Sequence, residues 1–334
     1  MKTILSGIQP SGKLHLGNYF GAIRQHIQMQ EQGDAFYFIA NYHSLTSLTD
    51  GEELRRNSLD VTLDYLALGM NPDRCTFFVQ SDVPQVVELS WILGTLTPVS
   101  LMEKSVAYKD KVAQGLAANI GLFTYPVLQA ADILIYGSDM VPVGADQKQN
   151  LEISRDLASK FNHIYNGDYF ILPEPYIVES VATVPGVDGH KMSKSYGNAI
   201  DIFEEGKSLK NKVMSIKTDS KELEDPKDPE SCNVFALIKL FADKNKTEEI
   251  AGNYRAGGYG YGHAKKELLS LITDYFGEAR EKRRELEKDP DYIHDILREG
   301  GRKARIRAEE IMEPVREAAG ILRHFSFEEP LSSR

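Results

Sequence analysis

The fold is indicated by a stretch near the start of the chain, Thr3-Ile4-Leu5-Ser6-Gly7-Ile8-Gln9-Pro10-Ser11-Gly12-Lys13-Leu14-His15-Leu16-Gly17-Asn18. Its first three residues predict a short buried strand, Gly7 to Gly12 predict a turn, and apolar residues recur at helical spacing from Asn18 to Gln30. A strand, a glycine-rich turn and a helix in this order are typical of α/β sheets that bind nucleotide phosphates at the helix start. The stretch therefore predicts an α/β fold with a phosphate site close to the N-terminus.

A second motif lies far downstream, at Lys191-Met192-Ser193-Lys194-Ser195. It places two lysines three residues apart on a loop of small residues. Lysine binds phosphate as a compact charge with rotatable donors, so this loop suits a phosphate chain that gains charge as it leaves. A lone pair of lysines at this spacing would be an ordinary solvated loop, but the exact pentapeptide occurring together with the N-terminal motif favours a phosphate site.

Composition agrees with a folded protein of roughly two domains, since the chain has 334 residues, 42% of them hydrophobic. No signal peptide or membrane-spanning run is apparent, so we expect a cytoplasmic protein with no membrane partner. The net charge of −10 argues against a general nucleic-acid coat protein and against DNA as a partner. Cys75 and Cys232 lack metal-ligand spacing, and we expect reduced thiols and no metal held by protein ligands alone.

Up to about Tyr176, apolar runs that suggest strands alternate with helical patterns, which predicts a Rossmann-like, doubly wound parallel sheet. In chain order, these alternating strand and helix patterns lie at Phe36–Ala40, Leu54–Leu68, Cys75–Gln80, Ile133–Tyr136 and Gln149–Phe161. A less regular segment, Leu89–Ala118, interrupts the rhythm. From Ile200 onward the pattern predicts an all-α domain with helices at Ser208–Ile216, Asn233–Lys244, Ala264–Glu287 and Arg302–Leu322. A loop is expected at Lys217–Glu230, a tight turn at Arg255–Gly262, and a helix break at Gly300-Gly301.

Three polar residues, Tyr125, Gln129 and Asp132, fall within about 40° of one face of an otherwise apolar helix. A buried carboxylate without a partner costs several kcal/mol, at order of magnitude, so Asp132 should face something specific. The alternative is that Asp132 forms a cap or bridge within the fold. His43, at the end of an expected strand, is a second candidate for the same site or a structural histidine.

The two motifs resemble the two signatures of class I aminoacyl-tRNA synthetases, and nearly the whole chain resembles the bacterial tryptophanyl-tRNA synthetases. Further matching pieces are Met102-Glu103-Lys104, Tyr108-Lys109-Asp110-Lys111, Tyr125 to Asp132, Val141 to Gln147, and Tyr259 to His263. The resemblance implies a catalytic domain at 1–195, a helical domain at 196–323 that reads the tRNA anticodon, and a frayed tail at 324–334. It also implies a homodimer, with the insertion at about 89–118 supplying the dimer contact.

The resemblance implies that the enzyme activates L-tryptophan with ATP and magnesium, releases pyrophosphate and charges tRNA(Trp). The catalytic residues would be Lys191, Lys194 and, from the insertion, Lys111; the last could equally be an exposed lysine, as could its neighbour Lys109. ATP would be bound by Gln9, Pro10, Ser11, Gly17, Asn18, Gly144, Ala145, Asp146 and residues 191–195. Asp146 could instead cap the next helix. Tryptophan would be bound by Leu5, Gly7, His43, Tyr125, Gln129, Asp132, Val141, Val143 and Gln147.

The sequence predicts the type of reaction more clearly than the amino acid that the enzyme activates. Bacterial tryptophan enzymes commonly have methionine where this chain has Gln129. Tyrosine enzymes share the tyrosine, glutamine and aspartate triplet. They usually place a second hydroxyl partner where this chain has Leu5, and an acidic residue where it has Gln9. An apolar Leu5 suits the face of an indole, so we expect tryptophan. A tyrosine enzyme, a catalytically silent RNA-binding relative and another adenylyltransferase remain the alternatives.

A group of basic residues near the C-terminus is a candidate tRNA contact. It consists of Arg302, Lys303, Arg305 and Arg307. Four glutamates follow on the same expected helix, so a solvated helix face is the competing interpretation.

Overall fold

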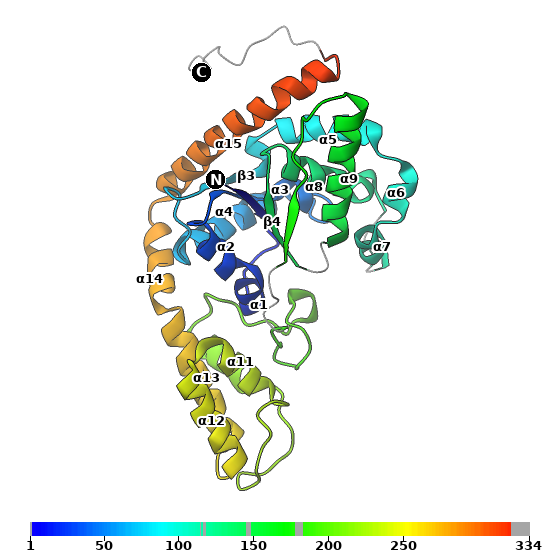
Figure 1. The fold of residues 1–334 in the computed structure, drawn as a ribbon. Coiled ribbons are helices and arrows are strands. Elements are labelled where there is room, and N and C mark those ends of the chain that lie inside the picture. Colours follow the sequence, from blue (N-terminus) through cyan, green and yellow to red (C-terminus); the bar gives the residue numbers. More distant parts are fainter. Residues whose placement is uncertain (1, 114, 116–117, 145–147, 178–182, 322–334) are drawn as a thin grey trace.

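A five-stranded parallel sheet forms the centre of the molecule (Figure 1). The computed structural model describes residues 2–113, 115, 118–144, 148–177 and 183–321. The strands are β1 (Thr3–Ile8), β2 (Asp34–Ile39), β3 (Thr76–Val79), β4 (Met140–Val143) and β5 (Glu174–Ile177). Their order is β3-β2-β1-β4-β5, with Leu5 beside Phe36 and Gly7 beside Phe38. The chain therefore changes direction across the sheet between β1 and β4, where α/β folds bind their ligands.

Alternate strand residues face two different hydrophobic clusters, which confirms the doubly wound architecture. Ile4 and Tyr37 belong to one cluster, whereas Leu5, Phe36 and Phe38 belong to the other. This is the alternation that a pleated strand imposes when both faces of a sheet are covered by helices.

The helices that follow the strands in the first half of the chain agree broadly with the sequence pattern. They are α1 (Leu16–Asn18), a π-helical turn at Tyr19–Ile23, α2 (Arg24–Met29), α3 (Asn41–Ser44), α4 (Gly51–Ala67), α5 (Gln85–Leu96), α6 (Val99–Glu103), α7 (Val106–Ala113), α8 (Ile120–Leu134) and α9 (Lys148–Ile164). The segment expected to be irregular, 89–118, is thus largely helical where it is described. The run Ile133–Tyr136 is not a strand: it ends α8 and continues into a turn, because its apolar residues fill the core beneath the sheet.

The second half is helical, as predicted. It contains α10 (Gly206–Met214), α11 (Asn233–Phe241), α12 (Lys244–Ala256), α13 (Tyr261–Tyr275), α14 (Gly277–Leu286) and α15 (Pro290–Ala318). The expected loop at 217–230 has no helix or strand. Helix α12 was not predicted, and the single helix expected at 264–287 is two helices that meet at Phe276. The expected tail, 324–334, lies outside the described residues.

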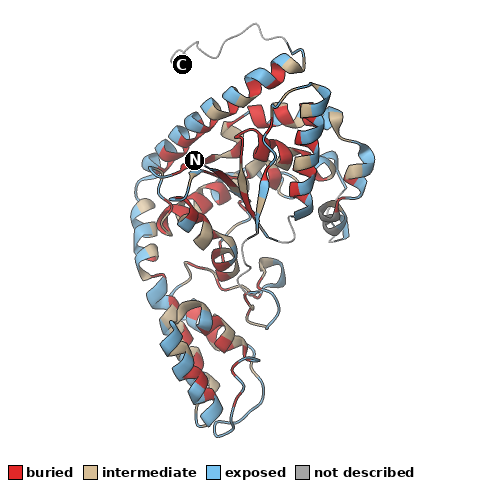
Figure 2. Cartoon of the chain, in the orientation of Figure 1, coloured by how far each residue is buried: buried red, intermediate tan, exposed pale blue. Residues whose placement is uncertain are grey.

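The expected break at Gly300-Gly301 is wrong, because α15 runs through both glycines and packs on the sheet (Figure 1). A Cβ atom at Gly300 would lie 1.8 Å from the carbonyl oxygen of Phe77 in β3. Glycine is therefore needed for the close approach of helix and strand, not for a turn. Figure 2 shows buried residues on the sheet-facing side of α15 and exposed ones on its outer side.

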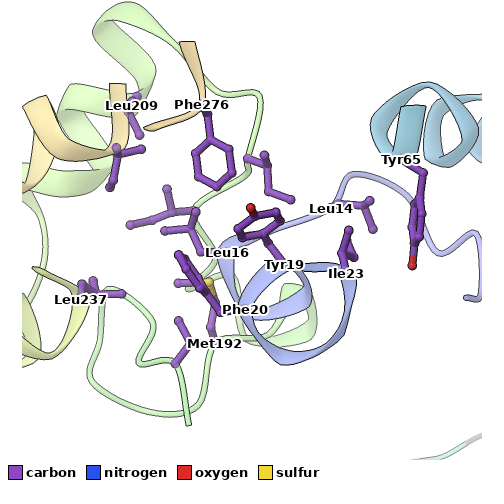
Figure 3. Close-up of a cluster of buried hydrophobic side chains, with 14 of the residues drawn as sticks. Leu14, Leu16, Tyr19, Phe20, Ile23, Tyr65, Met192, Leu209, Leu237 and Phe276 are labelled. Atoms are coloured by element: carbon purple, nitrogen blue, oxygen red, sulfur yellow. The ribbon is translucent and has the colours of Figure 1, made fainter. Parts of the chain in front are cut away.

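The N-terminal helix shares a hydrophobic core with the helical half of the chain. Leu16, Tyr19 and Phe20 pack with Leu237 and Phe276 in one cluster (Figure 3). The Tyr19 and Phe276 rings meet edge to face with centroids 5.0 Å apart. The helical half is thus joined directly to the helix that begins at the first motif. Among the described helices none is long and apolar enough to cross a membrane.

Candidate active site

A cavity of about 410 Å³ opens at the carboxyl ends of β1 and β4, where the chain changes direction across the sheet. Most of the residues predicted to bind tryptophan line it. They are Leu5, Gly7, His43, Tyr125, Gln129, Asp132 and Val141, together with Gln9 and Gly144 from the predicted ATP site. Val143 ends β4, but its side chain is not described, and Ala145, Asp146 and Gln147 lie outside the described residues.

The walls of the cavity are mainly apolar, and Asp132 is the only carboxylate among the described residues that line it. Leu5, Phe38 and Ile133 supply aliphatic and aromatic surface. A Cβ atom at Gly7 would lie 2.4 Å from the Phe38 ring, so glycine makes room for this ring beside β1. Phe38 was not predicted, although its place on β2 beside Gly7 follows from the parallel register.

Asp132 is buried, with 2% of its surface exposed, and its carboxylate is held by two side chains. His43 Nε2 lies 2.8 Å from Oδ2, and Gln80 Nε2 lies 2.8 Å from Oδ1 and 2.9 Å from Oδ2. The His43 ring also meets the Tyr125 ring edge to face at 6.1 Å. The carboxylate thus has partners within the fold, and it also faces the cavity.

Tyr125 and Gln129 lie on α8 with Asp132, as the helical spacing predicted. The Tyr125 hydroxyl accepts a hydrogen bond from Asn150 Nδ2 at 3.3 Å, which orients it from α9. Gln129 is half-buried in the cavity wall. The cavity therefore offers a carboxylate, a phenol and an amide from α8, together with aliphatic and aromatic surface from Leu5, Phe38 and Ile133.

The first motif ends in a reciprocal cap at the start of the helix. His15 Nδ1 accepts from the Asn18 N–H at 3.3 Å, and Asn18 Oδ1 accepts from the His15 N–H at 3.0 Å. Burial and, secondarily, the charge of Lys194 lower the pKa of His15 to about 4. The imidazole is therefore neutral at pH 7, and because Nδ1 accepts, its proton is on Nε2 and can be donated to a ligand.

The two motifs meet in space. Lys194 Nζ donates to the carbonyl oxygen of Ser11 at 3.0 Å, and it lies 3.9 Å from the position of a Cβ atom at Gly12. At Gly17 a Cβ atom would lie 3.0 Å from the His15 ring and 3.5 Å from Met192. The small residues of the first motif therefore allow the second motif to lie against it.

The loop of the second motif is held by a residue that the sequence did not single out, Asn198. Its Oδ1 accepts from the Ser193 N–H at 2.8 Å, and its Nδ2 donates to Asp188 at 2.8 Å and to the Lys191 carbonyl at 3.1 Å. The Met192 side chain, predicted at the ATP site, is buried in the hydrophobic cluster and anchors the loop (Figure 3). Lys191 and Ser195 are exposed, so their side chains are accessible to a nucleotide.

Other predicted residues lie at or near these motifs. Pro10 is buried and Ser11 is exposed in the turn of the first motif. Lys109 is exposed on α7; Lys111 lies on the same helix, but its side chain is not described. In the described part of the chain, no group of three or more His, Cys, Asp or Glu residues could hold a metal ion.

Half of the basic group on α15 is engaged within the protein. Arg302 pairs with Glu299 at 2.8 Å, and Arg307 donates to the Tyr136 carbonyl at 3.0 Å and pairs with Glu310 at 2.9 Å. Lys303 is exposed and Arg305 half-buried on the same helix. These contacts favour a helix face that stabilises the fold over a dedicated tRNA contact.

Comparisons with known proteins agree with this geometry. The family model described as "tRNA synthetases class I (W and Y)" matches residues 1–277. A Tryptophan--tRNA ligase of Fusobacterium nucleatum subsp. nucleatum is 55% identical over 96% of this chain and 99% of its own length. One from Rhodopirellula baltica is 50% identical over 95% and 99%, respectively.

A solved structure shows the same similarity in three dimensions. Tryptophanyl-tRNA synthetase from Campylobacter jejuni, complexed with ADP and tryptophan, superposes with a TM-score of 0.91 at 52% identity. The alignment covers 95% of this chain and 99% of that one. The family resemblance inferred from the two motifs is thus confirmed, and the chain belongs to the class I tRNA synthetases of the tryptophan and tyrosine family.

Proposed function

We propose that this protein is a tryptophan–tRNA ligase. It activates L-tryptophan with ATP to tryptophanyl-adenylate, releases pyrophosphate, and transfers the tryptophanyl group to tRNA(Trp). The observation that carries the proposal is the Asp132 carboxylate, the only one among the described residues of a mainly apolar cavity, which His43 and Gln80 hold in place. The same cavity is lined by Gln9, whose carbonyl oxygen accepts from the N–H of Ser11, the residue that Lys194 contacts. The relative from C. jejuni was solved with tryptophan and ADP, and we extend both ligands to the corresponding cavity of this chain.

The indole of tryptophan lies in the cavity with its N–H donating to Asp132. Leu5, Phe38 and Ile133 pack against the ring. Tyr125 and Gln147 hold the charged ends of the amino acid. When the bound side chain has no N–H to donate, an acceptor position of the buried carboxylate stays unsatisfied. A site of this kind rejects such side chains for that reason.

ATP binds with magnesium as part of the substrate, against the first motif and the loop at 191–195. The amino acid's carboxylate attacks the α-phosphorus in line, one oxygen–phosphorus bond forms as the bond to pyrophosphate breaks, and no covalent enzyme intermediate is required. Lys191 and Lys194 neutralise the charge that develops on the leaving pyrophosphate, and the neutral His15 donates from Nε2 to a phosphate oxygen. Lys111 adds a further charge from α7.

The helical domain at 196–323 reads the anticodon of the tRNA, and charging takes place in the cytoplasm. The enzyme acts as a homodimer through α5, α6 and α8. Trp91 is 78% exposed, Ile120 77% and Val99 64%, and all three line one apolar groove. Exposed apolar side chains gathered on one face are typical of a protein–protein interface, which supports a second copy as their partner.

The test is ATP–pyrophosphate exchange with tryptophan and tyrosine offered separately. We expect exchange with tryptophan and little with tyrosine. Exchange with tyrosine alone would favour the tyrosine alternative, which Gln129 in the cavity wall supports. Absence of exchange with both, on folded protein with magnesium, would identify a catalytically silent relative.

A further inference from the structure

We infer that Gln80 is a positioning residue that fixes the Asp132 carboxylate for selection of the indole N–H. The inference rests on the proposed function and adds a residue to it. Gln80 follows β3 directly, is 1% exposed and is not among the residues that line the cavity. It can therefore influence the bound amino acid only through another side chain.

The direction of each hydrogen bond of Gln80 follows from its partners. Its Oε1 lies 3.0 Å from the backbone N–H of Tyr42, which can only donate. The amide oxygen must therefore face Tyr42, and the Nε2 group must face Asp132, where it donates to both carboxylate oxygens. Gln80 thus presents a donor to Asp132 in one defined orientation.

Gln80 is itself held in place by a bridge between the segments that follow β2 and β3. Asn41 Nδ2 donates to Ser81 Oγ at 2.8 Å, and the Ser81 N–H donates to Asn41 Oδ1 at 3.1 Å. The neighbour of Asn41 is Tyr42, which binds Gln80, and the next residue is His43, which binds Asp132. Both donors to the carboxylate therefore come from one hydrogen-bonded unit.

The carboxylate of Asp132 is therefore held in one plane, with few acceptor positions left for a ligand. An ionised carboxylate has about four acceptor positions, and His43 and Gln80 occupy most of them. What remains faces the cavity and accepts a single N–H from the ligand. Without Gln80 the carboxylate can rotate, or turn fully toward His43, and its alignment with an indole N–H is lost.

The experiment compares L-tryptophan with L-3-benzothienylalanine, which replaces the indole N–H by sulfur and keeps the shape of the ring. We would measure kcat and KM for both in ATP–pyrophosphate exchange with Gln80→Met. The preference for tryptophan, as a ratio of kcat/KM values, should fall roughly ten- to hundredfold, mainly through KM for tryptophan. KM for ATP should not change.

Gln85→Met is the matched control. Gln85 is also buried, at 4% exposure, but it donates to Glu309 at 3.1 Å and does not line the cavity. It should leave the preference unchanged. A purely structural role for Gln80 predicts that Gln80→Met lowers stability and affects both amino acids equally, and that result would overturn the inference.

Gln80→Glu provides a second readout if the methionine variant does not fold. The introduced side chain can still accept from the Tyr42 N–H, but a second carboxylate then faces Asp132. At high pH the preference for tryptophan should be lost, and it should return as the pH is lowered and the introduced carboxyl group gains an O–H to donate. The inference is contradicted if the preference of Gln80→Glu for tryptophan changes with pH no more than that of the wild type. If the wild-type protein shows no exchange with tryptophan, the proposed function itself fails. If the wild-type protein does show exchange with tryptophan, the variants test the role of Gln80 alone.

Discussion

Lys194 Nζ donates to the carbonyl oxygen of Ser11 at 3.0 Å, a contact between residues 183 positions apart in the sequence. It closes the loop of the second motif on the turn of the first. Burial is the main reason that the pKa of Lys194 lies below its ordinary value, with Asp201 and Asp64 acting in the opposite direction. A partly buried ammonium group held by one carbonyl oxygen is ready to exchange that partner for a phosphate oxygen.

Lys194→Met should therefore slow adenylate formation and leave tryptophan binding intact. Removing one charge-stabilising donor from a transition state costs about 100- to 1,000-fold in rate. We expect a loss of that size in kcat of ATP–pyrophosphate exchange, with an unchanged KM for tryptophan. Lys207→Met, an exposed lysine on α10, is the control and should be fully active. An equal loss in kcat and in tryptophan affinity would instead assign Lys194 a structural role.

The proposed homodimer predicts that Trp91→Glu yields monomers. A carboxylate in the apolar groove of α5, α6 and α8 would have to lose its hydration when two copies associate, with no opposite charge to pair with it. Association therefore becomes unfavourable. Light scattering coupled to size-exclusion chromatography should give the mass of two chains for the wild type and of one for the variant. Tyr196→Glu, at another exposed aromatic residue outside this groove, should remain dimeric. A monomeric wild-type protein would refute the proposal directly.

Local patterns were enough to predict much of the fold and the site. The strand at Thr3, the helical face of Tyr125, Gln129 and Asp132, and the two motifs are short-range features, and each depends on spacing within one element. Parallel strands end at the same edge of a sheet, so His43 could be expected near the cavity from its place after β2. For these residues the sequence contained the necessary information.

Residues that act through distant partners could not be found in this way. Gln80 is 52 positions from Asp132, and Asn198 holds its loop through side-chain bonds to backbone atoms that no spacing rule specifies. An isolated buried glutamine or asparagine looks the same in a sequence whatever it binds. The helix break expected at Gly300-Gly301 is wrong for a related reason. Glycine is a poor helix former, but tertiary packing overrides its low helix propensity here.

The packing of α15 on β3 makes Gly300 sensitive to the smallest change. A Cβ atom there would lie 1.8 Å from the Phe77 carbonyl oxygen, and backbone atoms cannot yield as a flexible side chain can. Gly300→Ala should lower the free energy of unfolding by about 3 kcal/mol, the upper range for overpacking. Urea denaturation would measure it.

Gly252→Ala is the control for that experiment, since it lies within α12 with no atom within 4 Å of its added Cβ. It should raise stability by about 0.5–1 kcal/mol, because alanine loses less backbone entropy than glycine in a helix. Equal effects of the two substitutions would show that α15 does not approach β3 as closely as described.

Stability should also depend on pH through His26. Burial lowers the pKa of His26 to about 4, and its ring lies between Ser6 Oγ at 2.9 Å and the Tyr65 hydroxyl at 3.1 Å. Between about pH 6.5 and pH 4 the unfolded chain binds a proton at this residue and the folded chain does not. The free energy of unfolding should therefore fall as the pH is lowered through this window, by roughly 3 kcal/mol from His26.

Other groups act in the same window, so the contribution of His26 is measured as a difference. His15, whose pKa is also about 4, changes stability in the same direction, whereas burial raises the pKa of Asp64 to about 6 and opposes it. Urea unfolding of the wild type and of His26→Gln at a series of pH values separates these effects. The variant should be less stable at neutral pH, because one buried and one partly buried hydrogen bond are disturbed, but its stability should fall less steeply with acid. Parallel pH profiles would mean that the His26 site admits a proton in the folded protein.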